Sequence, residues 1–195
     1  MHGLGSNPRR FAMLVRNYPG RARFVLPRAP DPYGPQGYSW FPLTRPLHRP
    51  PKATLNHMLK SADRLAALIR ELQADHPNTP KPIIMGFSQG GLMSYAVATR
   101  HPQLIRAALP ISGWLPDAMV PTQAPNFTPL IWSMHGTSDT VVPELPTRTM
   151  VDTLKALHFQ VEYTSWPNVG HTISQDMRHA LFEQLDTLLA QESPP

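Results

Sequence analysis

The 195-residue sequence has no cysteine, few charged residues and no long apolar run. The lack of cysteine excludes disulfide bonds, zinc sites built on thiolates and a cysteine nucleophile. No apolar run approaches the ~18 residues that a membrane-spanning helix needs, and charged residues make up only 16% of the chain. The H-E-x-x-H, G-x-G-x-x-G and P-loop motifs are also missing. We therefore expect a globular protein that works without a metal or another cofactor.

Acidic residues are scarce in the first 60 residues, which hold ten Lys and Arg but only Asp31 as an acid. This part has a net charge of +9, and residues 61–195 have −4. A basic half can attract anionic surfaces or substrates, although a solvated arginine-rich surface is the simpler explanation. The arginines are scattered and follow no RNA-binding or recognition-helix pattern, so nucleic-acid binding is not predicted. We expect at most a weak contact with an anionic lipid surface.

The arrangement of apolar residues predicts an α/β fold with a mostly parallel central sheet flanked by helices. With 41% hydrophobic residues the chain is long enough for one globular domain, residues 1–195. Short apolar runs alternate with amphipathic segments, as in parallel sheets with crossover helices. Strands are predicted at 23–26, 82–86, 107–111, 130–135 and 161–166. Helices are predicted at 54–75, 89–100, 145–158 and 175–191, where apolar residues recur every three or four positions.

The motif Gly86-Phe87-Ser88-Gln89-Gly90 lies between a predicted strand and a predicted helix. A G-x-S-x-G in this position is typical of the nucleophile elbow of α/β-hydrolases, a tight strained turn that exposes a serine. The serine then stands at a helix N-terminus, where the helix dipole favours negative charge. A glycine-rich turn with an incidental serine is the alternative, and the strand before the motif and the helix after it argue against that alternative.

A serine nucleophile needs a base, and in this fold the order along the chain is serine, acid, histidine. Asp139 follows a predicted strand and lies 51 residues after Ser88. His171 follows the last predicted strand and lies 32 residues after Asp139. Each interval admits one or two strand–helix units, and the carboxyl ends of parallel strands meet at one edge of a sheet. We therefore expect Ser88, Asp139 and His171 to form a catalytic triad. Asp117 is the main rival for the acid, and His135 is expected to support its loop.

Two backbone N–H groups are candidates for an oxyanion hole, which stabilises the negative oxygen of a tetrahedral intermediate. One belongs to Gln89, directly after the serine, and the other to Leu4 in the glycine-containing turn at residues 2–5. Apolar side chains near the motifs are candidates for a substrate-binding groove. These candidates are Phe87, Trp40, Trp114 and Leu115.

These motifs together resemble the phospholipase/carboxylesterase family of α/β-hydrolases, the group that includes acyl-protein thioesterases. The resemblance implies the triad and oxyanion hole named above. It also implies hydrolysis of carboxylic esters, acyl thioesters or lysophospholipids without a cofactor. The matching stretches are HGLG at 2–5, RFVLPRAP at 23–30, GYSWF at 37–41, GFSQGG at 86–91, ISGWLP at 111–116, HGTSDTVVP at 135–143 and GHTIS at 170–174.

In the family, a strand from the middle of the sheet precedes the HGLG turn, whereas this sequence starts at that turn. We therefore expect the N-terminal strand to be missing from the 195 residues and to lie upstream of Met1. No signal peptide is visible, which favours a cytoplasmic protein.

Taken together, these features predict a serine esterase that cleaves a small acyl ester or thioester through an acyl-enzyme intermediate. We expect it to be a monomer or a homodimer. The alternative is a non-catalytic ligand-binding module on the same fold. A complete set of serine, acid and histidine argues against that alternative.

Overall fold

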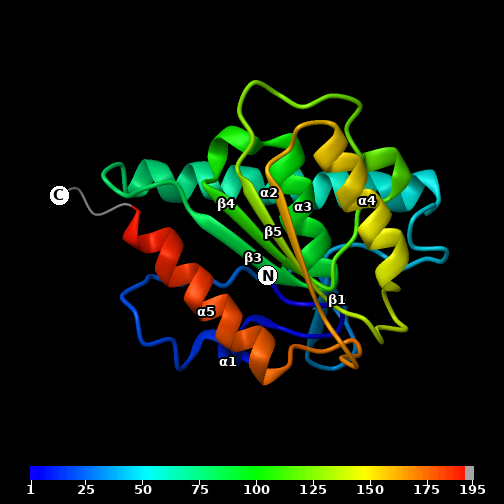
Figure 1. Cartoon of the computed structure of the whole chain (residues 1–195), viewed down its shortest axis with the longest axis horizontal. Helices are drawn as coiled ribbons and strands as arrows, with labels where there is room; N and C mark the ends of the chain where they lie inside the picture. Colours follow the sequence, from blue (N-terminus) through cyan, green and yellow to red (C-terminus); the bar gives the residue numbers. More distant parts are fainter. Residues whose placement is uncertain (192–195) are drawn as a thin grey trace.

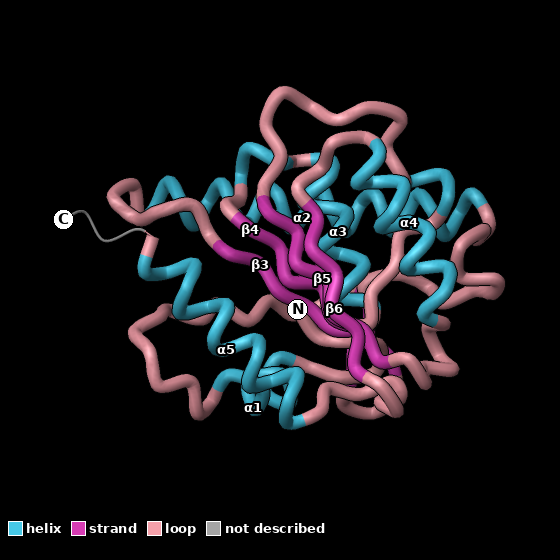
Figure 2. The backbone as a smooth tube through the Cα atoms, viewed as in Figure 1, coloured by secondary structure: helices cyan, strands magenta, loops and turns pink. Residues whose placement is uncertain are grey.

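Four parallel strands in the order β3-β4-β5-β6 form the central sheet of the computed structural model, which describes residues 1–191. The strands are β3 (Ile83–Phe87), β4 (Ala107–Ile111), β5 (Leu130–Gly136) and β6 (Val161–Trp166). Helices α2 (Lys52–Asp75), α3 (Gln89–Arg100) and α4 (Glu144–Ala156) cover one face of the sheet. Helices α1 (Pro8–Val15) and α5 (Gln175–Ala190) cover the other face (Figures 1 and 2). None of the helices within residues 1–191 is long and apolar enough to cross a membrane.

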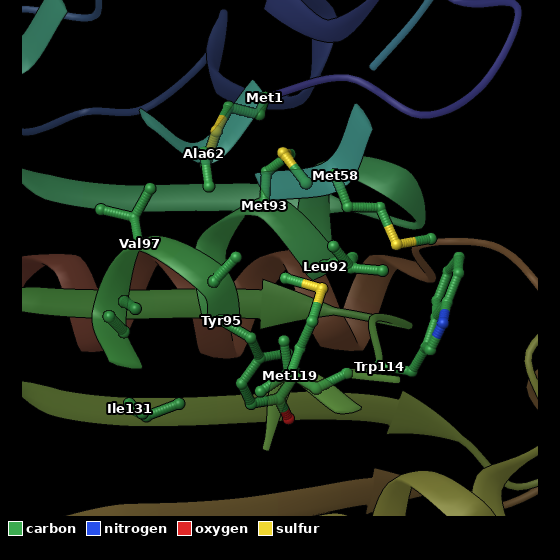
Figure 3. Packing of buried hydrophobic residues seen from close by; sticks show 14 of the residues in the cluster. Met1, Met58, Ala62, Leu92, Met93, Tyr95, Val97, Trp114, Met119 and Ile131 are labelled. Atoms are coloured by element: carbon green, nitrogen blue, oxygen red, sulfur yellow. The ribbon is translucent and has the colours of Figure 1, made fainter. Parts of the chain in front are cut away.

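The hydrophobic core lies in two layers, one on each face of the sheet. The larger layer joins α2, α3 and α4 to the sheet, and Figure 3 shows Met58, Leu92, Tyr95 and Trp114 packed within it. The smaller layer packs α5 against the opposite face of β4 and β5. All five residues of β4 are buried, because a strand covered by helices on both faces reads as a continuous apolar run.

The predicted α/β-hydrolase fold is confirmed, and the four predicted strands from residue 82 onward lie within one residue of their observed bounds. The strand predicted at residues 23–26 is wrong, since this segment forms no strand. An apolar slot of about 410 Å³ lies between it and the neighbouring elements, lined by Leu26, Ile69, Ile83 and Met85 among others. A strand needs a neighbouring backbone to form hydrogen bonds with, and the slot keeps this segment apart from β3.

Met1 runs beside β3 and pairs with it. Its amino group donates to the carbonyl oxygen of Met85 (2.6 Å), and its carbonyl oxygen accepts from the N–H of Phe87 (3.1 Å). The residue before the turn at residues 2–5 thus has the hydrogen-bonding position of a strand next to β3. This pairing fixes where the turn leaves the sheet, directly beside the end of β3.

Three elements of the N-terminal segment were not predicted: α1, β1 (Asp31–Tyr33) and β2 (Gly37–Ser39). Helix α1 begins with a cap that the sequence does contain, since Asn7 accepts from the N–H of Arg10 and a proline follows it. Strands β1 and β2 form an antiparallel hairpin. Tyr38 of β2 accepts from the N–H of Gly5 and donates to the carbonyl of Ser6, so the hairpin holds the turn at residues 2–5 in place. Two 3-10 turns, Pro102–Leu104 and Asp117–Met119, complete the structure.

Candidate active site

Ser88 occupies a strained turn between β3 and α3. Its φ of 57° and ψ of −115° lie outside the regions that non-glycine residues ordinarily adopt. The N–H of Ser88 donates to the carbonyl of Ile111 (2.9 Å), which anchors the turn to β4. A β-carbon at Gly86 would overlap the carbonyl of Gly90, and one at Gly90 would overlap the carbonyl of Met1. Both glycines are therefore required by close backbone approach.

A line of two hydrogen bonds joins Ser88, His171 and Asp139 across three loops. The Nδ1–H of His171 donates to Oδ2 of Asp139 (2.7 Å), and the hydroxyl of Ser88 donates to Nε2 of His171 (3.0 Å). The ring of Phe87 packs on the His171 imidazole, with ring centroids 4.7 Å apart. The structure thus brings together the three residues of the predicted triad, in the geometry that a serine nucleophile and its base require.

The carboxylate of Asp139 is buried and held in its ionised form. Its Oδ1 accepts from the N–H groups of Val141 (2.9 Å) and Val142 (2.8 Å). Burial alone would raise the pKa of Asp139, but the hydrogen bonds from His171 and these two N–H groups outweigh it and lower the pKa. A fixed negative charge therefore faces the Nδ1–H of His171.

Neither Asp117 nor His135 takes part in the two hydrogen bonds that join Ser88, His171 and Asp139. Asp117 is exposed and pairs with Arg49 (2.9 Å). His135 is fully buried next to Asp139, and its Nε2–H donates to the carbonyl of Val142 (2.8 Å). Burial lowers the pKa of His135, which keeps its imidazole neutral. His135 therefore acts as a support of the Asp139 loop in the described structure.

Both candidate oxyanion donors stand beside Ser88. Leu4 and Gln89 line the same cleft as the serine, and neither backbone N–H has a hydrogen-bond partner within residues 1–191. Gly3 brings the turn close, because a β-carbon there would lie 3.3 Å from Cβ of Ser88. Two unpaired N–H groups near a hydroxyl provide donors for a developing negative charge.

Ser88 and His171 open into a cleft of about 720 Å³ with mostly apolar walls. Of the four predicted substrate-binding residues, Phe87 and Trp114 line it. The structure does not place Trp40 and Leu115 on this cleft. Both are buried in the core, and the indole N–H of Trp40 donates to the carbonyl of His2 (2.9 Å). Trp40 thus stabilises the turn at residues 2–5 and has no face on the cleft.

Sequence reasoning missed the residues that α1 and the loop before α2 bring to the cleft. Arg10, Met13 and Leu14 come from α1, and Leu43 and Arg45 come from the loop. The Asn7-Pro8 start of α1 was a usable helix signal, but nothing in the sequence indicates which face of so short a helix meets the cleft. Within the part of the chain that is described, no three His, Asp or Glu side chains are grouped as metal ligands.

The sequence profile described as phospholipase/carboxylesterase matches residues 1–189. The Arabidopsis thaliana protein named "Probable carboxylesterase SOBER1-like" is 30% identical, over 90% of this chain and 72% of its own length. The protein of Gibberella zeae named "Acyl-protein thioesterase 1" is 25% identical, over 100% of this chain and 89% of its own. Among solved structures, esterase PE8 superposes with a TM-score of 0.80 at 29% identity, covering 96% of this chain and 89% of that one.

Proposed function

The chain belongs to the phospholipase/carboxylesterase family, and from this premise we propose that it is a serine hydrolase of carboxylic esters or acyl thioesters. The observation that carries the proposal is the unbroken hydrogen-bond line from Ser88 through His171 to Asp139. Ser88 lies in a strained elbow and lines a mostly apolar cleft. The names of the related proteins, carboxylesterase and acyl-protein thioesterase, support the same reaction class.

In the first step, Oγ of Ser88 attacks the carbonyl carbon of the substrate. The hydroxyl proton passes to Nε2 of His171, which already accepts its hydrogen bond (3.0 Å). The imidazolium that forms is stabilised by the ionised carboxylate of Asp139, which also holds the ring with Nδ1–H facing it. The carbonyl oxygen becomes an oxyanion in this step.

The oxyanion lies against the N–H groups of Leu4 and Gln89. An oxyanion-hole donor contributes about 10²–10³ in rate, provided that it is fixed before the reaction. The Leu4 turn is fixed by Gly5 and Ser6, which pair with Tyr38, and by the indole of Trp40. The Gln89 N–H is fixed as the first residue of α3. Collapse of the intermediate expels the alcohol or thiol, which takes its proton from His171.

The acyl group is then bonded to Ser88, and water completes the reaction. His171 removes a proton from the water, whose oxygen attacks the acyl carbonyl. The second tetrahedral intermediate expels Oγ of Ser88, which recovers its proton from His171. The products are a carboxylic acid and the free enzyme, and no cofactor is consumed.

The test is hydrolysis of 4-nitrophenyl butyrate and butyryl thiocholine by the wild-type chain and by Ser88→Ala. Removing one triad member costs about 10⁴–10⁶ in kcat, so we expect the variant to lose both activities. Ser138→Ala is the matched control, because Ser138 is exposed on the Asp139 loop and forms no side-chain hydrogen bond within residues 1–191. A folded Ser88→Ala protein that retains more than a few per cent of the wild-type rate would disprove the proposal.

A further inference from the structure

Three arginines line the cleft that contains Ser88 and His171, and no aspartate or glutamate among residues 1–191 lines it. They come from separate elements: Arg10 from α1, Arg45 from the loop before α2, and Arg178 from the first turns of α5. The remaining walls are mostly apolar and include Phe11, Leu43, Leu47, Trp114 and Ile173. The cleft therefore combines an apolar surface with three positive charges from separate elements.

None of these three guanidinium groups pairs with a carboxylate of residues 1–191. Outside the cleft, Arg49 pairs with Asp117 and Arg100 pairs with Asp63. Like charges around one concave, apolar surface repel each other and focus the electrostatic potential into it. The cleft thus carries a positive charge that the described protein does not neutralise.

We propose that the substrate of this site carries an anionic group, a carboxylate or a phosphate, which Arg10, Arg45 and Arg178 bind while Ser88 attacks the ester or thioester carbonyl. This inference rests on the proposed hydrolase function. Guanidinium groups suit both anions, because their planar donors form paired, charge-assisted hydrogen bonds with two oxygens at once. The apolar walls accommodate the hydrocarbon part of the same substrate.

The three arginines contribute unequally. Arg178 is half-buried, whereas Arg10 and Arg45 are exposed, and charges in contact with bulk solvent are screened more strongly. Arg178 also stands near the N-terminus of α5, where Ser174 and Gln175 line the cleft as well. The partial positive charge of that helix end adds to its attraction for an anion. Arg178 is therefore expected to be the main specificity-determining residue.

The test compares kcat/KM for two pairs of esters that differ in charge. Mono(4-nitrophenyl) adipate against 4-nitrophenyl heptanoate places a carboxylate on the acyl side. 1-Butanoylglycerol 3-phosphate against 1-butanoylglycerol places a phosphate on the leaving group. We expect the anionic ester of at least one pair to be preferred about tenfold at low salt, falling to about twofold or threefold at 0.5 M NaCl. The preferred pair identifies which anion the arginines recognise.

Charge-neutralising variants then assign the preference to residues. Arg178→Gln should remove most of the anionic-to-neutral ratio of kcat/KM, and Arg10→Gln and Arg45→Gln should each reduce it about twofold to threefold. Arg16→Gln is the matched control, since Arg16 directly follows α1, is exposed and does not line the cleft. That variant should keep the wild-type ratio.

The outcomes separate this inference from the hydrolase proposal. If the neutral esters are hydrolysed by Ser88 but both anionic esters are equal or worse substrates, the anion inference is wrong and the hydrolase proposal stands. An anionic preference that Arg16→Gln reduces as much as Arg178→Gln does would also overturn it, because net charge rather than the cleft would then be responsible. Lack of Ser88-dependent hydrolysis of any ester would instead refute the hydrolase proposal itself.

Discussion

The sheet and its crossover helices, residues 83–190, contrast with the first 51 residues. The former contain regular strand–helix units that hold Ser88, Asp139 and His171 at the carboxyl ends of strands. The latter contain one short helix and a hairpin of two three-residue strands, and 10 of the 24 prolines of the chain lie among them. Yet this irregular segment supplies Leu4 and two of the three arginines in the cleft. The regular region positions the triad, and the irregular segment contributes part of the cleft wall.

The two regions meet at Gln89. Its side-chain oxygen accepts from the N–H of Trp40 (3.0 Å) and the hydroxyl of Ser39 (3.2 Å), and its side-chain nitrogen donates to the carbonyl of Phe41 (2.8 Å). Its own backbone N–H is a candidate oxyanion donor. The side chain of Gln89 therefore connects the irregular segment to the elbow. We expect these contacts to fix the position of the Leu4 N–H relative to the Gln89 N–H.

The largest expected effect lies in the regular region. Asp139→Asn should lower kcat about 10³–10⁴-fold, because an amide favours the wrong His171 tautomer and cannot stabilise the imidazolium. Asp117→Asn, which loses only an exposed ion pair with Arg49, should stay within about twofold of wild type. Kinetics with 4-nitrophenyl butyrate measure both variants. The reverse pattern would move the acid to Asp117.

Glycine substitutions compare the tolerance of the two regions to added volume. Gly90→Ala should lower the free energy of unfolding by about 3 kcal/mol or more, since its β-carbon would overlap the carbonyl of Met1. Gly34→Ala, in the hairpin turn, meets no atom within 4 Å but has a φ of +67°. It should cost about 1–2 kcal/mol. Urea denaturation measures both, and equal losses would contradict the contrast.

The link between the regions is tested by Gln89→Leu. This change leaves the N–H of Trp40 buried without its partner, which should cost about 1–3 kcal/mol of stability. The carbonyl of Phe41 loses one of its two hydrogen bonds and keeps the one from the hydroxyl of Ser39 (2.6 Å). It should also lower kcat while the Ser88–His171 pair remains, because the Leu4 turn loses its alignment. Gln73→Leu is the control, since Gln73 makes one long hydrogen bond (3.5 Å) far from the elbow in sequence. An unchanged kcat in Gln89→Leu would show that the alignment of the Leu4 turn does not depend on the Gln89 side chain.

The smallest expected effect is a dependence of stability on pH in the N-terminal segment. His2 is buried, donates from Nδ1 to the carbonyl of Gly3 (2.8 Å) and accepts at Nε2 from the N–H of Ala29 (3.2 Å). Burial, aided by the Met1 amino group, lowers its pKa below the usual 6.5. The unfolded chain therefore takes up a proton at His2 that the folded chain excludes, and this group lowers stability as the pH decreases below about 6.5, by at most ~1.4 kcal/mol per pH unit. Burial also lowers the pKa of the Met1 amino group, to about 5, so that group adds a dependence of the same sign.

Urea unfolding between pH 7.5 and 5.5 measures this dependence. His2→Asn removes the buried imidazole and should reduce the slope by the contribution of His2, whereas His57→Gln, on the exposed face of α2, should leave the slope unchanged. A wild-type slope that His2→Asn does not reduce would assign the dependence to other groups.

How far the sequence predicts the structure differs between these regions for a physical reason. Buried strands and amphipathic helices leave periodic apolar patterns, so β3 to β6, the four long helices and the positions of Ser88, Asp139 and His171 were predictable. The N-terminal segment is held by single contacts between distant residues, such as Tyr38 with Gly5 and Trp40 with His2. Such contacts produce no periodic pattern of apolar residues in the sequence. The sequence therefore predicts that Trp40 lines the substrate groove, whereas in the structure its indole supports the turn at residues 2–5.

The central claim is that the Ser88–His171–Asp139 line makes Ser88 a nucleophile, and labelling with a fluorophosphonate tests it most directly. The phosphorus atom traps an activated serine and needs no choice of acyl chain. The account predicts one adduct per chain, which peptide mass spectrometry places on Ser88, and a rate of labelling that falls strongly in Asp139→Asn. Absence of an adduct on the folded wild-type chain, or an adduct on another serine, would contradict the account.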